Sequence, residues 1–280
     1  MPYTEHFQGI QRLQGSNVLY LTGAGEHEHE SQLIVMTVGS RPEDGPFGNN
    51  LISQGDWLTE TPAEDVVVNT VRFDHEFYHA GGFTSFGNYL AIGSEKGCTA
   101  NERMMGQCVD ESKVHFFDAA NATGPAPLPY SVDRPTGSAG AVAITQEQDG
   151  RFLMMVGRTD SNILDFYRSK GTSLATDPGF ELFTTWYKES LLVDAGVSSA
   201  YEKYQTLNFI RQTDGKLFMI GMSRTVFGLG NDMADLFEVD ASHSKSVTIK
   251  KVASRHMSCP EGTCNFEAGA GGYVEAPTPL

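Results

Sequence analysis

Two histidines hold matching places at the starts of predicted strands and are the first candidates for chemistry. His6 precedes an apolar stretch near the N-terminus, His79 precedes the corresponding stretch of the next repeat, and Glu267 holds the comparable place near the C-terminus. Neutral imidazoles and a carboxylate suit a divalent metal, and without metal the same groups bind a polar ligand or transfer protons. We therefore predict a polar site formed by His6, His79 and Glu267, with a divalent metal as its candidate cofactor. The alternative is that the histidines only satisfy backbone groups of their own strands.

Tyr78 stands directly before His79 and adds a phenol at the same place. A histidine and a tyrosine can act as base and acid in a polysaccharide lyase. A glycosidase instead needs a pair of carboxylates, and the starts of these strands offer Glu267 alone. The catalytic candidates are therefore His79, Tyr78 and Glu267.

The segment from His75 to His79 also spells the H-E-x-x-H pattern of zinc metalloproteases. That pattern requires a helix that carries both histidines on one face. Gly81 and Gly82 follow at once and lead into a strand. The segment is therefore predicted to be a loop, and a metalloprotease is not predicted.

Further polar residues stand where predicted second strands end. Glu95, Arg158 and Arg224 each follow such a strand. If these strand ends surround one mouth of a channel, the three side chains could grip a polar ligand such as a carbohydrate. Asn208, inside a predicted inner strand, joins His6 and His79 as a further ligand-binding candidate.

The elements that must position these residues repeat along the chain. Four apolar runs end in Gly23, Gly93, Gly157 and Gly221, which are spaced by 70, 64 and 64 residues. A turn and another apolar strand precede each run, and a third strand follows it. Glycine with asparagine or aspartate between such strands indicates hairpins. Each repeat is thus predicted to hold three or four antiparallel strands.

This pattern resembles the β-propeller superfold over nearly the whole chain. In such a fold the first strand of each blade lines the axis, where crowding favours the small residues found there. A fifth first strand is predicted near 264–274, so we expect an all-β, five-bladed propeller with an incomplete or irregularly closed last blade. The predicted repeats are 6–73, 79–132, 139–192, 204–256 and 264–280, within a single domain or a fragment spanning 1–280.

The four cysteines form two local pairs. Cys98 and Cys108 close one loop, and Cys259 and Cys264 close another. Two disulfides are predicted, which implies an oxidising compartment and hence a secreted or periplasmic protein. Free thiols are one alternative. A zinc site of all four cysteines is another, but the first pair is spaced too widely for a typical zinc ligand pair.

Composition narrows the set of partners. The formal net charge of -15 argues against binding to nucleic acid, which usually needs a basic face. No stretch approaches the roughly 20 apolar residues that a membrane helix needs, so membrane insertion is not predicted. A polar small molecule, a glycan or a protein remains as partner.

Three functions remain open from the residues alone, because a superfold carries no function of its own. The first is an extracytoplasmic ligand-binding or interaction propeller with a polar, glycan-like ligand. The second is a glycan-active lyase or hydrolase, with or without metal assistance, acting in the propeller channel. The third is a structural module of a larger secreted protein. Convergence of His6, His79 and Glu267 would favour the enzyme, and dispersal would favour binding or a scaffold.

Overall fold

The computed structural model describes residues 6–13, 16–25, 30–39, 65–96, 105, 110–223, 232–243 and 245–257, without the side chains of His6, Gly25 and Thr159. These residues form four sheets, of which three have four strands and one has five. The short helical segments are η2 (Thr159–Ser161) and η3 (Lys188–Ser190). In the described part of the chain, no helix has the length and apolar character needed to cross a membrane.

The strands of each sheet follow the chain in order from the inside outward. Blade 1 holds β1 (His6–Arg12), β2 (Val18–Gly25), β3 (Glu30–Thr37) and β4 (Val66–Asp74). Blade 2 holds β5 (His79–Phe86), β6 (Tyr89–Glu95), β7 (Ser112–Asp118) and β8 (Ala126–Arg134). Blade 3 holds β9 (Ala141–Gln146), β10 (Phe152–Gly157), β11 (Ile163–Ser169) and β12 (Phe180–Tyr187). Blade 4 holds β14 (Thr206–Arg211), β15 (Leu217–Ser223), β16 (Asp232–Asp240) and β17 (Thr248–Met257), with β13 (Leu192–Val193) parallel to β17.

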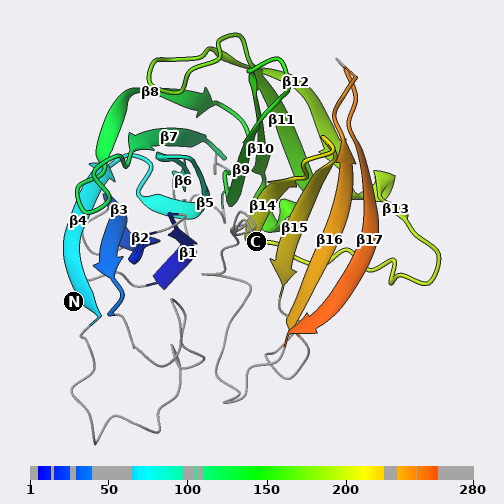
Figure 1. Ribbon diagram of the computed structural model, residues 1–280, viewed down its shortest axis with the longest axis horizontal. Helices are drawn as coiled ribbons and strands as arrows, with labels where there is room; N and C mark the ends of the chain where they lie inside the picture. Colours follow the sequence, from blue (N-terminus) through cyan, green and yellow to red (C-terminus); the bar gives the residue numbers. More distant parts are fainter. Residues whose placement is uncertain are drawn as a thin grey trace, which may run out of the picture.

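The sheets are arranged as propeller blades. Figure 1 shows them fanned around a common centre, with their first strands innermost. The inner strand β5 contacts β1, β9 and β14, and β9 contacts β14. Apart from β13, neighbouring strands within each blade run antiparallel, as short hairpins require. The predicted β-propeller is therefore confirmed, and the four repeated apolar runs are the second strands of the four blades.

The number of blades differs from the prediction. The described residues form four blades, not five. The predicted fifth repeat, 264–280, lies outside the described residues. Its prediction depended on one first strand, and a single strand cannot form a blade because a sheet needs partner strands.

The hydrophobic core lies between neighbouring blades. One cluster joins blades 1 and 2 around Phe83, a second joins blades 2 and 3 around Phe116, and a third joins blades 3 and 4 around Phe166 and Phe237. Alternating strand side chains from one blade thus meet those of the next, which fixes the angle between blades. Truncating a buried phenylalanine such as Phe83 to alanine would cost about 3–5 kcal/mol.

The inner strands approach one another closely enough to exclude side chains. A Cβ at Gly81 would lie 2.5 Å from the Ala139 carbonyl oxygen, and one at Gly82 would lie 2.4 Å from the Gln205 carbonyl oxygen. The Gly82 N–H donates a hydrogen bond of 2.8 Å to the Gly140 carbonyl. Glycine is therefore needed here for close backbone approach, which confirms the predicted crowding at the axis.

Candidate functional site

A histidine and a glutamate meet where the first hairpin of blade 2 opens. His79 is the first residue of β5, Glu95 is the last residue of β6, and the two are direct cross-strand partners. His79 Nδ1 lies 3.3 Å from Glu95 Oε2. The side chains are 29% and 21% exposed, so solvent or a ligand can reach both. The pair can bind a polar group or exchange a proton with it.

Groups from blades 1 and 3 complete this site. The Ala139 N–H donates to Glu95 Oε1 at 2.9 Å, and the Gln8 amide nitrogen lies 3.3 Å from His79 Nε2. One proton arrangement satisfies all these contacts: His79 Nδ1–H donates to Glu95, and the Gln8 amide donates to Nε2. We call Gln8, His79, Glu95 and Ala139 the axial mouth.

A β-bulge places Gln8 in the axial mouth. The register of β1 against β2 shifts between Phe7 and Gly9, which leaves Gln8 without a cross-strand partner. Bulges of this kind redirect a side chain and are common beside functional sites. Phe7, the preceding residue, is 44% exposed and offers an aromatic surface at the same end of β1.

A second polar contact crosses the axis further along β1. The Gln11 amide donates to Asn208 Oδ1 at 2.7 Å and to the Phe83 carbonyl at 3.1 Å. Asn208 is buried, and among the described residues its Nδ2 has no hydrogen-bond partner. The predicted ligand-binding residue Asn208 therefore lies within the axial packing rather than in the axial mouth.

Arg158 lies near the axial mouth but is bound to a carboxylate of its own blade. Its Nε and Nη2 donate to Asp165 at 2.9 and 3.1 Å, and Thr185 donates to the same carboxylate at 2.7 Å. Arg134, from β8, contacts Asp165 as well. Burial alone would raise the pKa of Asp165, but these hydrogen bonds and the two positive charges outweigh it and lower the pKa.

Gly140 lies between Glu95 and the backbone of Arg158. A Cβ built at Gly140 would lie 3.8 Å from Glu95 Oε1 and 4.0 Å from the Arg158 carbonyl oxygen, with no described atom nearer than 3.8 Å. These are ordinary contact distances, so there is room for a side chain at this point. The ends of the two strands that carry Glu95 and Arg158 thus lie near each other, and the Arg158 guanidinium points toward Asp165. The expectation that Glu95, Arg158 and Arg224 grip a polar ligand stays a prediction.

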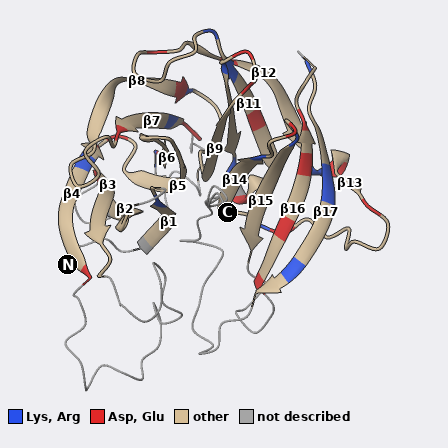
Figure 2. Ribbon diagram, viewed as in Figure 1, with Lys and Arg blue, Asp and Glu red and all other residues tan. Residues whose placement is uncertain are grey.

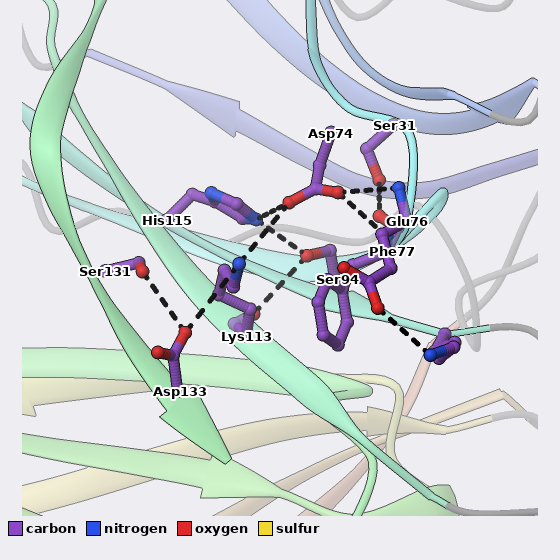
Figure 3. A network of polar contacts seen from close by, with 10 residues as sticks. Ser31, Asp74, Glu76, Phe77, Ser94, Lys113, His115, Ser131 and Asp133 are labelled. Atoms are coloured by element: carbon purple, nitrogen blue, oxygen red, sulfur yellow. Dashed lines mark hydrogen bonds and ion pairs between the residues drawn. The ribbon is translucent and has the colours of Figure 1, made fainter. Parts of the chain in front are cut away.

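A polar network holds the loop that delivers His79 to the axial mouth. Asp74, at the end of β4, accepts hydrogen bonds of 2.8 Å from the backbone N–H groups of Glu76 and Phe77. Its other oxygen lies 3.3 Å from His115 Nε2 and 3.8 Å from Lys113 Nζ, as Figure 3 shows. Burial would raise the pKa of Asp74, but the bonds from His115 and the backbone lower it to about 2.

The H-E-x-x-H segment has the loop structure that the sequence indicates. Residues 75–77 form a bend, and His75 Nδ1 contacts Glu30 at 3.0 Å, away from the His79–Glu95 pair. Tyr78 is the residue directly before β5, and it is partly buried. Its catalytic role stays a prediction.

Several predicted site residues lie outside the described residues. These are Glu267, Arg224, Cys98, Cys108, Cys259 and Cys264, and for His6 only the backbone is described. Among the residues that the structure does describe, no group of three or more His, Cys, Asp or Glu could hold a metal ion. The proposed metal triad of His6, His79 and Glu267 and both disulfides thus stay predictions.

Sequence reasoning missed Gln8, Arg134 and Asp165 as members of the site region. Gln8 stands two residues after His6, in a segment already assigned to an inner strand, but its role depends on the bulge. Asp165 lies within a largely apolar strand and is buried. An acidic residue in such a strand indicates a buried carboxylate with basic partners, so the sequence did contain a signal for this cluster.

Comparisons with known proteins find remote structural likenesses. No family model matches the chain, and no curated protein matches it. The solved structures include an exo-β-1,3-galactanase from Clostridium thermocellum, with 8% identity, a TM-score of 0.44 and coverage of 87% of this chain and 47% of that one. A xylan β-1,4-xylosidase from Bacillus halodurans has 10% identity, a TM-score of 0.46 and coverage of 92% and 48%.

An α-L-arabinofuranosidase from Lactobacillus brevis has 10% identity, a TM-score of 0.43 and coverage of 87% of this chain and 78% of that one. This chain spans about half the length of the galactanase and the xylosidase. Their names describe all three as enzymes that act on glycans. With TM-scores this low, the likenesses carry no argument for this chain, and its assignment as a propeller depends on its own sheet topology.

Proposed function

We propose that the protein is a glycan-active enzyme that uses the axial mouth, with His79 as its proton-transfer group. The observation that carries this proposal is the position of His79 between Glu95 and Gln8. A carboxylate that accepts the Nδ1–H keeps the imidazole in one tautomer and orients Nε2 away from Glu95. Nε2 now accepts from the Gln8 amide at 3.3 Å, and a substrate that displaces this amide would meet a positioned base.

The residue types around His79 suit a sugar. Gln8 and Glu95 provide hydrogen-bonding groups for hydroxyls, and the exposed ring of Phe7 provides an apolar surface for a sugar ring. Of the described residues in the axial mouth, only Glu95 is a carboxylate, whereas hydrolysis uses two. Proton abstraction by His79, as in a lyase, therefore fits this set better than hydrolysis.

A ligand-binding propeller without catalysis is the second candidate. It is favoured by the hydrogen bonds that already engage both nitrogens of His79, because such an imidazole can also serve as a plain hydrogen-bonding contact. In that case the same glycan-type ligand would occupy the axial mouth without being changed.

Alanine at His79 distinguishes the two candidates. Wild type, His79→Ala, Glu95→Gln and the control His243→Ala, an exposed histidine of blade 4, would be assayed for cleavage of a panel of neutral and acidic polysaccharides. We expect His79→Ala to lower turnover by about 100-fold or more, as loss of a general base does. Glu95→Gln should lower turnover less, and His243→Ala should leave it unchanged.

The assay has clear contrary outcomes. Binding of a polysaccharide by the wild type without turnover, lost in His79→Ala, would support the second candidate instead. Turnover that survives in a folded His79→Ala protein would overturn the role of His79. Equal melting temperatures of the variants would show that the fold is intact.

We also propose that the protein works outside the cytoplasm. This proposal rests on the two local cysteine pairs, Cys98 with Cys108 and Cys259 with Cys264. Mass spectrometry of non-reduced protein should find both pairs disulfide-bonded. Four free thiols in protein secreted from its host would contradict it.

A further inference from the structure

The cluster around Asp165 carries more positive than negative charge. Asp165 is 2% exposed, and two arginines, Arg134 and Arg158, contact its carboxylate. The other side chains bonded to Asp165 or Arg134 are neutral hydroxyls, those of Thr185, Tyr167 and Ser112. Because a guanidinium stays protonated in proteins, two arginines on one carboxylate leave one net positive charge.

The surplus charge lies on Arg158. Arg134 is buried, whereas the side chain of Arg158 is 30% exposed. The bonds from Arg158 to Asp165 use only part of its N–H donors, so it can donate to a second anion as well. The nearby acid Asp160 already has a cationic partner, Lys203, at 3.0 Å. This local positive charge stands out in a chain whose net charge is -15. Figure 2 shows the acidic segment of β11 to which the arginines bind.

The segment 137–140 connects Arg158 with the axial mouth. A Cβ at Gly137 would lie 2.8 Å from Arg158 Nε, so the guanidinium packs directly on this glycine. Two residues on, the Ala139 N–H holds Glu95, and Gly140 leaves room between Glu95 and the Arg158 backbone. The space at Gly140 thus separates Glu95 from the Arg158 backbone, and the Arg158 guanidinium packs on Gly137, two residues before the Ala139 N–H that holds Glu95.

We infer that the glycan carries a carboxylate and that Arg158 binds it, so that the substrate class is a uronate-containing glycan. This inference rests on the proposed function and deepens it by naming the substrate. The partly exposed guanidinium recognises the carboxylate, and His79 faces the sugar carbon next to it. Opposite charges at the two ends of the site, cationic at Arg158 and anionic at Glu95, orient the sugar.

The chemistry that follows is a β-elimination. His79 Nε2 takes the proton from the carbon that bears the carboxylate, and the electrons of that C–H bond form a carbon–carbon double bond. The glycosidic C–O bond on the next carbon breaks, and its electron pair leaves with the oxygen. The imidazolium or water returns a proton to that oxygen. Arg158 stabilises the charge that develops on the substrate carboxylate, and no oxidant or reductant is needed.

The test compares acidic oligosaccharides with their neutral counterparts. Calorimetry would measure binding of oligogalacturonate, oligoglucuronate and oligomannuronate, each beside its carboxyl-reduced form. We expect at least one acidic oligomer to bind tenfold or more tightly than its reduced form. Arg158→Gln should weaken binding of that oligomer about tenfold or more and leave the reduced form unaffected. Arg158→Lys should fall between, and Lys203→Gln, a nearby exposed cation, should match wild type.

The outcomes separate this inference from the proposed function. Equal binding of every acidic oligomer and its reduced form, or unchanged acidic binding in a folded Arg158→Gln protein, would overturn the inference. Turnover of a neutral glycan that depends on His79 would overturn it too, while the proposed function stands. Binding of an acidic oligomer that depends on Arg158 but is never followed by turnover would support the carboxylate contact and contradict the enzyme.

Discussion

Blades 3 and 4 bury a carboxylate at equivalent points of their third strands. Asp165 pairs with Thr185 of the fourth strand and accepts its hydroxyl hydrogen bond, and Asp235 does the same with Ser254. The basic partners differ. Asp165 has two arginines, one of them partly exposed, whereas among the described residues the basic partner of Asp235 is Lys251.

The blade 4 cluster is sealed from solvent. Lys251 Nζ lies 2.9 Å from Asp235 and donates to the Ala200 carbonyl at 2.8 Å, and Tyr204 also bonds Asp235. Burial, together with the charge of Asp235, raises the pKa of Tyr204 well above its usual range, so the phenol stays neutral. Figure 2 shows acidic and basic segments side by side on β16 and β17.

One position of the repeat thus carries clusters of different net charge in the two blades. In blade 4 the positive charge of Lys251 balances the negative charge of Asp235. The hydrogen bonds of this cluster join the strands to the segment 200–204. In blade 3 the second arginine, Arg158, leaves one surplus positive charge on a partly exposed side chain. The comparison predicts that the blade 4 cluster matters to stability alone and that the outer arginine of blade 3 matters to ligand binding.

The largest effect is expected for Lys251→Met. This change leaves Asp235, which is fully buried, without its cation, and such an unpaired buried charge costs about 3–5 kcal/mol of unfolding free energy. Urea denaturation would measure it. Lys250→Met is the matched control, because Lys250 is an exposed neighbour bound to Asp194 and Glu238. If Lys251→Met lowered the unfolding free energy no more than the control does, the blade 4 cluster would not contribute to stability as predicted.

Arg134→Met should cost somewhat less, about 3 kcal/mol. Arg134 is buried and contacts Asp165, Ser112 and Tyr167, but Arg158 remains to neutralise the carboxylate. The same denaturation experiment measures this cost. A loss as large as that of Lys251→Met would mean that Arg158 contributes no compensation, and the two clusters would then be alike.

Acid should reduce the contribution to stability of Asp74, a partly buried carboxylate between blades 1 and 2. Its folded pKa of about 2 lies below the ordinary 3.8, so its contribution is complete above pH 4 and is lost as pH falls through about 2. The difference in unfolding free energy between wild type and Asp74→Asn should be about 2 kcal/mol at neutral pH. It should shrink between pH 4 and pH 2. A difference independent of pH would contradict the lowered pKa.

The smallest effect on stability is expected for Arg158→Gln, about 1 kcal/mol or less. Arg158 is partly exposed, and after its removal Asp165 keeps Arg134 and Thr185. Thermal unfolding would measure the change. A loss near that of Arg134→Met would make Arg158 a second structural arginine and would remove the contrast between the two clusters.

Much of the fold could be predicted from the residues themselves. The regular spacing of Gly23, Gly93, Gly157 and Gly221 indicated the blades, and their second strands lie where the apolar runs predicted. Local signals suffice here, because hairpin turns and alternating apolar residues determine strands without reference to distant parts of the chain. The number of blades was not predictable in this way, since one strand at 264–274 carries no information about its partners.

The candidate site was only partly predictable. His79 and Glu95 were identified from their types and their places at strand ends, and both lie in the axial mouth. Their direct pairing was not predictable. A two-residue turn at Gly87 and Asn88 would place Lys96 opposite His79, but the register shift between Ala80 and Phe83 moves Glu95 there instead.

Local sequence patterns thus indicate the strands and the residue types at their ends, whereas the packing of the blades selects which of these residues meet. The extra residue in β5 is accommodated because Gly81 and Gly82 have no side chains and can press against the backbone of blades 3 and 4. A register shift of one residue changes the partner of every residue beyond it. Lys96 would otherwise lie opposite His79, and only packing at the axis places the Glu95 carboxylate there instead.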